Sequence, residues 1–163
     1  MPRDDSGLPR QNLAVAAARL QSHHLGAPLF VYGTLQFDAV LMALIGRVPR
    51  QRKASAPGWR IASLEGRVYP GLVAEDGTIA DGHLLNDLST AEGRLLDAFE
   101  DDRYRLLDMA LTSEENALTY VWEGDGASRE SWDAEGFRVH HLERYAERCA
   151  RLAPTLKART SPA

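Results

Sequence analysis

The stretch PLFVYGTL, at residues 28–35, decides the fold of this chain. It is a short apolar run with β-branched and aromatic side chains, and it turns polar just after Gly33. A run of this kind is typical of a buried strand that enters a turn, so we expect the first core strand here. The apolar residues from Phe37 to Ile45 recur at i, i+3 and i+4 spacing. This spacing predicts a helix that ends at Gly46.

The segment from residue 54 to residue 88 predicts several short strands. Apolar and polar side chains alternate along part of it, and glycines and prolines interrupt the run. Glu75-Asp76-Gly77 lies between two strand-like runs, so we expect a hairpin turn there. Ser89 and Glu92 then have the spacing of a capping box, which predicts a helix at about 90–100.

The rest of the chain predicts two more strands and a last helix. Residues 104–111 and 117–122 are strand-like and are joined around Glu114-Glu115-Asn116. The glycine-rich residues 124–130 are expected to form a loop. Asp133 can cap a helix on which four side chains share one stripe: Phe137, His141, Tyr145 and Cys149.

This order of short strands and inserted helices favours an α+β fold with a compact, barrel-like sheet. Apolar residues at helical spacing predict a further helix at 11–25. We therefore divide the chain into four parts. They are an N-terminal helical extension at 1–27, a core at 28–123, a loop and C-terminal helix packed on the core at 124–152, and a flexible tail at 153–163.

The composition is that of a globular protein, with 44% hydrophobic and 26% charged residues. A net charge of −4 provides no field that would attract nucleic-acid phosphates or anionic lipid, so neither is an expected partner. Cys149 is the one cysteine and cannot close an internal disulfide. The first residues lack the apolar core of a signal peptide, and no run reaches the roughly 20 apolar residues of a membrane helix. A cytoplasmic location is the expectation.

Two places in the sequence could carry chemistry. A glycine after a buried strand lets the chain turn sharply, so the N–H groups of Thr34 and Leu35 could point at one spot and hold a carboxylate. Glu100 follows an apolar helical face and has acidic neighbours, which suits a general base. Each signal has a plain alternative, in which Gly33 only breaks the strand and Glu100 is a solvated helix end.

The order and spacing of three motifs point to a known family. They are VYGTL at 31–35, Tyr69-Pro70-Gly71, and LLDAFEDDRY at 95–104. Over about residues 28–123 the chain resembles the gamma-glutamylcyclotransferase-like superfamily, which includes gamma-glutamylamine cyclotransferases and plant AIG2-like proteins. The resemblance implies a small mixed β-barrel flanked by helices and a small-molecule gamma-glutamyl substrate, with no cofactor and no metal. It implies that the substrate's alpha-carboxylate is bound at Tyr32, Gly33, Thr34 and Leu35, and that Glu100 is the catalytic acid/base.

The chain departs from the family pattern at two positions. Asp101 stands where the family usually has glycine, and Leu106 stands where it usually has arginine, with Arg105 as a candidate replacement. These departures are the sequence hint for one alternative, a non-catalytic binding module on the same fold. A gamma-glutamyl amide hydrolase, in which the same glutamate activates water, is a second alternative. The sequence does not indicate which amine is released or what the oligomeric state is.

Overall fold

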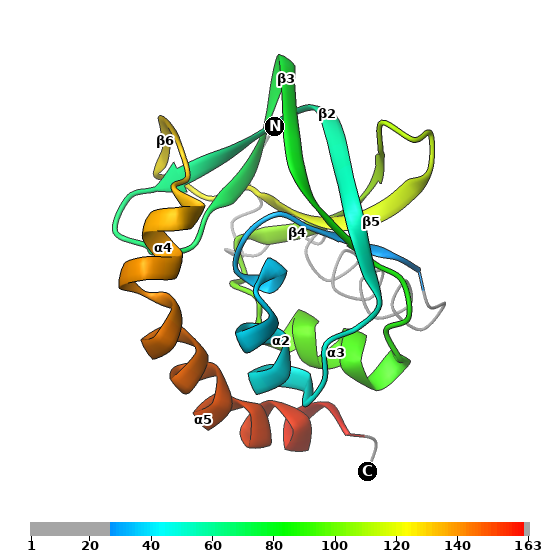
Figure 1. Ribbon diagram of the computed structural model, residues 1–163, viewed down its shortest axis with the longest axis vertical. Coiled ribbons are helices and arrows are strands. Elements are labelled where there is room, and N and C mark those ends of the chain that lie inside the picture. Colours follow the sequence, from blue (N-terminus) through cyan, green and yellow to red (C-terminus); the bar gives the residue numbers. More distant parts are fainter. Residues whose placement is uncertain (1–26, 162–163) are drawn as a thin grey trace, which may run out of the picture.

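A mixed sheet, curled into a half-barrel, forms the centre of the protein (Figure 1). The computed structural model describes residues 27–161, and within them the strand order is β4-β5-β1-β3-β2-β6. Strand β1 pairs antiparallel with β3 and parallel with β5, which makes the sheet mixed. The predicted α+β class and the mixed, barrel-like sheet are thus confirmed. The elements are β1 (Leu29–Val31), the 3-10 helix η1 (Thr34–Gln36), α2 (Asp38–Ile45), β2 (Gln51–Leu64), β3 (Gly71–Leu85), α3 (Thr90–Phe99), β4 (Tyr104–Ala110), β5 (Asn116–Trp122), β6 (Ala127–Ser131), α4 (Ala134–His140) and α5 (Leu142–Thr160).

The first strand is buried on both faces of the sheet. Leu29 and Val31 pack into the apolar cluster that also receives the helices, including Leu41 of α2 and Leu96 of α3. Phe30 faces the other way, into a second cluster. Successive strand residues point to opposite faces, so a strand covered on both sides must be apolar throughout. This explains why residues 28–31 read as a continuous apolar run.

Strands β2 and β3 form one long antiparallel hairpin instead of the several short strands that the sequence predicts. They have 14 and 15 residues. Pro57 pairs with Ile79 and Trp59 pairs with Ala74, so residues 75–78 bulge out between two paired stretches. The predicted hairpin in this segment is wrong, because both halves of β3 pair with β2 and not with each other.

The two predicted strands after α3 are confirmed as β4 and β5, and their connection curls back to β2. The backbone N–H of Thr112 donates to the Ser55 carbonyl oxygen at 2.8 Å, and the Thr112 hydroxyl donates to the same oxygen at 3.0 Å. Arg52 of β2 also forms an ion pair with Glu115. These contacts join the β4–β5 connection to β2 and stabilise the curvature of the sheet.

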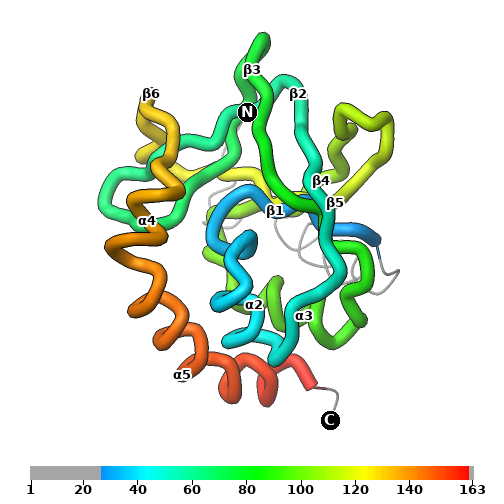
Figure 2. The backbone as a smooth tube through the Cα atoms, viewed as in Figure 1, coloured from blue at the N-terminus to red at the C-terminus, as the bar shows by residue number. Residues whose placement is uncertain are grey.

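Helices α2, α3 and α5 lie together beneath the sheet (Figure 2). The predicted capping box of α3 is confirmed: the Glu92 N–H donates to the Ser89 hydroxyl at 3.1 Å, and the Ser89 N–H donates to the Glu92 carboxylate at 2.9 Å. Arg47, which follows α2, donates to the same carboxylate at 2.6 Å. The cap therefore sets the start of α3 and also links it to the end of α2.

The C-terminal part differs from the prediction in three ways. The predicted loop at 124–130 contains strand β6, which pairs with β2. The predicted single helix is two helices, because His141 leaves helical geometry between α4 and α5. The predicted tail is wrong for most of its length, since α5 continues through Pro154 to Thr160 and buries Leu156 to 6% exposure. The predicted helix at 11–25 lies outside the described residues, and none of the described helices is long and apolar enough to cross a membrane.

Candidate active site

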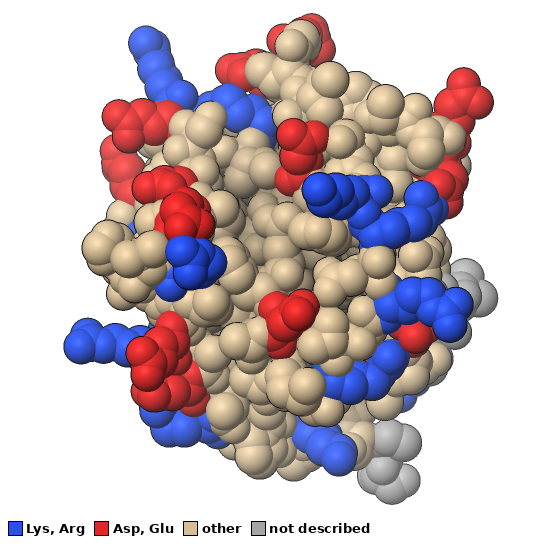
Figure 3. Space-filling view, in the orientation of Figure 1, with Lys and Arg blue, Asp and Glu red and all other residues tan. Residues whose placement is uncertain are grey.

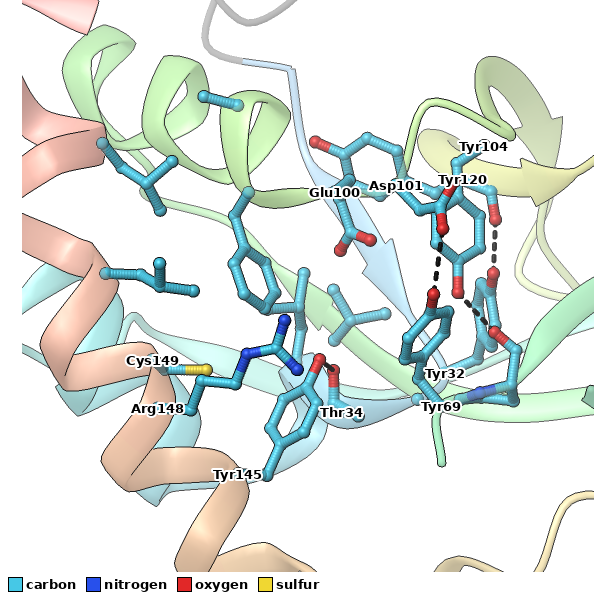
Figure 4. A pocket seen from close by; sticks show the side chains of 18 of the residues that line it. Tyr32, Thr34, Tyr69, Glu100, Asp101, Tyr104, Tyr120, Tyr145, Arg148 and Cys149 are labelled. Atoms are coloured by element: carbon cyan, nitrogen blue, oxygen red, sulfur yellow. Dashed lines mark hydrogen bonds between the residues drawn. The ribbon is translucent and has the colours of Figure 1, made fainter. Parts of the chain in front are cut away.

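A pocket of about 310 Å³ opens where the end of β1, the end of α3 and one face of α5 meet (Figure 4). The turn at Tyr32–Leu35 and the carboxylate of Glu100 both line it. The resemblance assigned both segments to the same substrate, and the structure brings them together in one pocket. The other polar or reactive side chains in the wall are those of Tyr69, Asp101, Tyr104, Tyr120, Tyr145, Arg148 and Cys149.

The turn after β1 is a short 3-10 helix. Its hydrogen bonds run from the Gln36 N–H to the Gly33 carbonyl at 3.1 Å and from the Phe37 N–H to the Thr34 carbonyl at 3.2 Å. The first N–H groups of a helical turn have no acceptor within that turn. Thr34 and Leu35 are the first two residues of this turn, and both line the pocket. Their N–H groups can therefore bind an anionic ligand.

Glycine is required at position 33 for a reason that the sequence did not reveal. Its φ is −123°, so it does not use the left-handed region that favours glycine. A Cβ at this position would instead lie 2.8 Å from Cγ of Pro70, closer than real Cβ atoms come to other heavy atoms. The close contact joins the turn to Tyr69-Pro70-Gly71, the second motif of the resemblance.

The substitution Gly33→Ala is therefore expected to affect both binding and folding. The added methyl group must push Pro70, which is part of the pocket wall, and overpacking of this kind costs about 1–3 kcal/mol. Urea denaturation together with a substrate titration checks this. A variant with unchanged stability and unchanged substrate affinity would show that neither the Pro70 contact nor the turn matters.

Glu100 lies immediately after the last residue of α3. Its N–H still donates to the Leu96 carbonyl at 3.1 Å, but its ψ of 145° takes the chain out of the helix. The side chain is partly buried and points into the pocket (Figure 4). Its negative charge, after burial, is a cause of the raised pKa of the Tyr145 hydroxyl. Burial, and then this same charge, outweigh the opposing charge of Arg148 and raise the pKa of the Cys149 thiol to about 11.

Tyr32 contributes to the scaffold through its hydroxyl. This hydroxyl donates to the Tyr120 carbonyl at 2.5 Å and accepts from the Leu72 N–H at 3.2 Å. Burial, with the nearby charge of Glu100, raises the pKa of Tyr32 well above its usual value. The hydroxyl is thus neutral and ties β1 to β3 and β5, while the ring lines the pocket.

Three other tyrosines of the wall are also anchored by their hydroxyl groups. Tyr104 donates to the Pro70 carbonyl, and Tyr120 donates to the Asp97 carboxylate at 2.7 Å. Tyr145 of α5 receives a hydrogen bond of 3.4 Å from the Thr34 hydroxyl. The sequence signal available for Tyr145 was its place on the helical stripe with Phe137, His141 and Cys149.

Asp101, the first departure from the family pattern, holds Tyr69 in place. Its carboxylate accepts from the Tyr69 hydroxyl at 2.9 Å and from the Arg103 N–H at 2.9 Å. Burial opposes ionisation, but these hydrogen bonds and the charges of Arg103 and Arg67 outweigh it and lower the pKa of Asp101. A glycine could not make these contacts, so Asp101 gives this chain an ionised support for one wall of the pocket.

Arg105 does not replace the arginine of the family pattern, so that prediction is wrong. Arg105 points away from the pocket and pairs with Glu123 on the surface at 3.0 Å. Adjacent strand residues face opposite ways, which explains this orientation. The guanidinium that does line the pocket belongs to Arg148 of α5, and sequence reasoning missed it. The available signal was its position three residues after Tyr145, on the same face of the helix.

The distribution of other charged groups does not suggest a different kind of site. On the face shown in Figure 3, acidic and basic side chains are interspersed and form no block of one sign. Among residues 27–161, no group of three or more His, Cys, Asp or Glu side chains is arranged to hold a metal ion.

Comparison with known proteins identifies the family. The family model described as gamma-glutamyl cyclotransferase, AIG2-like, matches residues 29–143. AIG2-like protein D of Arabidopsis thaliana is 40% identical over 45 residues, which are 28% of this chain. The matched part spans only 30% of that relative's length.

Solved structures show the same fold. The solution structure of At5g39720.1 from Arabidopsis thaliana has a TM-score of 0.59 and 25% identity, covering 84% of this chain and 95% of that chain. The solution structure of At3g28950.1 from the same plant has a TM-score of 0.57 and 26% identity, covering 83% and 85%. The family model covers well over half of the chain and includes both the turn and Glu100. The chain belongs to the AIG2-like gamma-glutamyl cyclotransferase family.

Proposed function

We propose that this chain is a cyclotransferase-type enzyme that releases 5-oxoproline and a free amine from a gamma-glutamyl compound. The observation that carries the proposal is the position of Glu100 opposite the turn, with both lining one pocket (Figure 4). A partly buried carboxylate is suited to move a proton, and the turn offers backbone N–H groups to a carboxylate. These are the groups that an intramolecular attack by an alpha-amine requires.

The first step makes the nucleophile. An alpha-ammonium group has no lone pair, so it cannot attack until it loses a proton, and Glu100 takes that proton. The N–H groups of Thr34 and Leu35 hold the alpha-carboxylate meanwhile. Fixing this end brings the amine near the gamma-carbonyl of the same molecule, and such positioning supplies a large part of the rate of an intramolecular reaction.

The second step closes the ring. The alpha-nitrogen bonds to the gamma-carbonyl carbon, and the bond from that carbon to the leaving nitrogen breaks. The alpha-nitrogen loses two of its three protons in total, and both end on the leaving amine, which departs as an ammonium ion. Glu100 carries these protons and returns to its starting state. No water is consumed, which is the difference from hydrolysis.

Product analysis tests the proposal. The protein is incubated with a panel of gamma-glutamyl amino acids and gamma-glutamyl amines, and the products are identified by mass spectrometry. We expect 5-oxoproline and an equal amount of the free amine. Free glutamate as the product would establish a gamma-glutamyl amide hydrolase instead. Binding without turnover across the panel would establish a non-catalytic binding module.

A further inference from the structure

We infer that Arg148 of α5 is the cationic partner of the substrate's alpha-carboxylate, so that the pocket recognises the zwitterionic head of an alpha-amino acid. The inference rests on the proposed function, because it adds a residue that binds the substrate of the same pocket. Arg148 lies beyond residue 143, where the match to the family model ends. The family model therefore gives no role to this position of α5.

The first support is the position of Arg148 on α5. Tyr145, Cys149, Leu152 and Leu156 line the pocket with it. Residues three and four apart lie on the same helical face, so this stripe turns one side of α5 toward the pocket. Tyr145 contacts Thr34 through a hydrogen bond of 3.4 Å, which places this face of α5 against the turn. Arg148 follows one helical turn later and extends into the pocket (Figure 4).

The second support is that two side chains of opposite charge, Arg148 and Glu100, line the same pocket. Among residues 27–161, Arg148 is the one Lys or Arg side chain that lines this pocket. Both charges act on the Cys149 thiol: the charge of Arg148 lowers its pKa, and the charge of Glu100 raises it. An alpha-amino acid carries a carboxylate and an ammonium group on one carbon. Arg148 with the turn suits the carboxylate, and Glu100 suits the ammonium group.

The third support is that the backbone N–H groups of the turn carry no full positive charge to balance the substrate's carboxylate. Two N–H groups can hydrogen-bond a carboxylate but leave most of its charge uncompensated, whereas a guanidinium supplies both donors and a full positive charge. The other nearby arginines are committed elsewhere: Arg67 and Arg103 pair with Asp101, and Arg105 pairs with Glu123. Arg148 is thus the residue placed to balance the charge of the bound carboxylate.

The test compares two substrates that differ only at the alpha-carbon. One is the gamma-glutamyl amide of butylamine, whose alpha-carboxylate is its only carboxylate, and the other is the same molecule with an alpha-carboxamide. With the first, Arg148→Gln should raise KM by about 10- to 100-fold and change kcat much less, as expected for the loss of one charge-assisted hydrogen bond. With the second, Arg148→Gln and the wild-type protein should have the same KM. Arg148→Lys should give an intermediate KM, because lysine keeps the positive charge but loses the two parallel N–H donors of the guanidinium.

Arg151→Gln is the matched control. Arg151 is exposed on the same helix and does not line the pocket, so its loss should leave KM unchanged. An equal penalty for Arg148→Gln with both substrates, or none with the carboxylate substrate, would overturn the inference. A penalty that appears only with gamma-glutamyl-alanine, whose leaving group carries a carboxylate, would also overturn it.

Failure of the proposed function is a separate result. If the wild-type protein releases no 5-oxoproline, calorimetric Kd values for the same two compounds replace KM. The inference then predicts the same pattern, with a carboxylate preference that Arg148→Gln removes. Absence of any binding by the wild-type protein would overturn both proposals.

Discussion

Glu100→Gln is expected to lower the rate of 5-oxoproline release by about 10² to 10⁴, the usual contribution of a positioned acid/base group. Glutamine has nearly the same shape and keeps an oxygen that accepts hydrogen bonds, but it cannot take the ammonium proton. Glu100 follows α3 at a partly buried position, so we expect the fold to survive the change. The measurement is single-turnover release of 5-oxoproline, with the circular dichroism spectrum as a check on folding.

The control for this variant must be chosen from the structure. Asp97 and Asp101 are unsuitable, because each accepts a hydrogen bond from a tyrosine of the pocket wall. Asp102 is exposed and does not line the pocket, so Asp102→Asn should keep nearly the full rate. A folded Glu100→Gln protein that releases 5-oxoproline at the wild-type rate would eliminate the proposed mechanism.

Tyr32→Phe is expected to destabilise the protein by about 2–4 kcal/mol, because a buried donor and a buried acceptor each lose their partner. The affected groups are the Leu72 N–H and the Tyr120 carbonyl, on either side of β1. Phenylalanine keeps the ring, so the apolar contacts of position 32 should persist. Urea denaturation measures the change as a lower midpoint at unchanged slope.

Tyr145→Phe is the comparison for this second variant. Its hydroxyl takes part in one long hydrogen bond of 3.4 Å with Thr34, so the stability loss should be about 1 kcal/mol or less. If Tyr32→Phe changed stability as little as Tyr145→Phe and instead raised KM, the Tyr32 hydroxyl would be a substrate ligand and not a part of the scaffold.

The features that could be predicted from the sequence are those specified within a few residues. The capping box of Ser89 and Glu92 is a local hydrogen-bond exchange, and it begins α3 as expected. The apolar run at 28–31 can be satisfied only by burial on both faces, which made β1 predictable. The family resemblance also implied that Glu100 and the turn act on one substrate. It did not indicate that Pro70 leaves no room for a Cβ atom at position 33.

Only the tertiary structure decided the features that depend on a distant partner. Residues 75–77 have the composition of a hairpin turn, but pairing with β2 on both sides makes the segment a bulge. Pro154 looks like a helix end because it lacks an N–H, yet burial of Leu156 against the core carries α5 past it. Packing of α5 against the turn, where Thr34 contacts Tyr145, brings Arg148 to the pocket. The local sequence therefore determined the turn after β1 and the position of Glu100 at the end of a helix. Packing between distant segments decided which tyrosines and which arginine surround these two groups, because the spacing of neighbouring residues does not encode such packing.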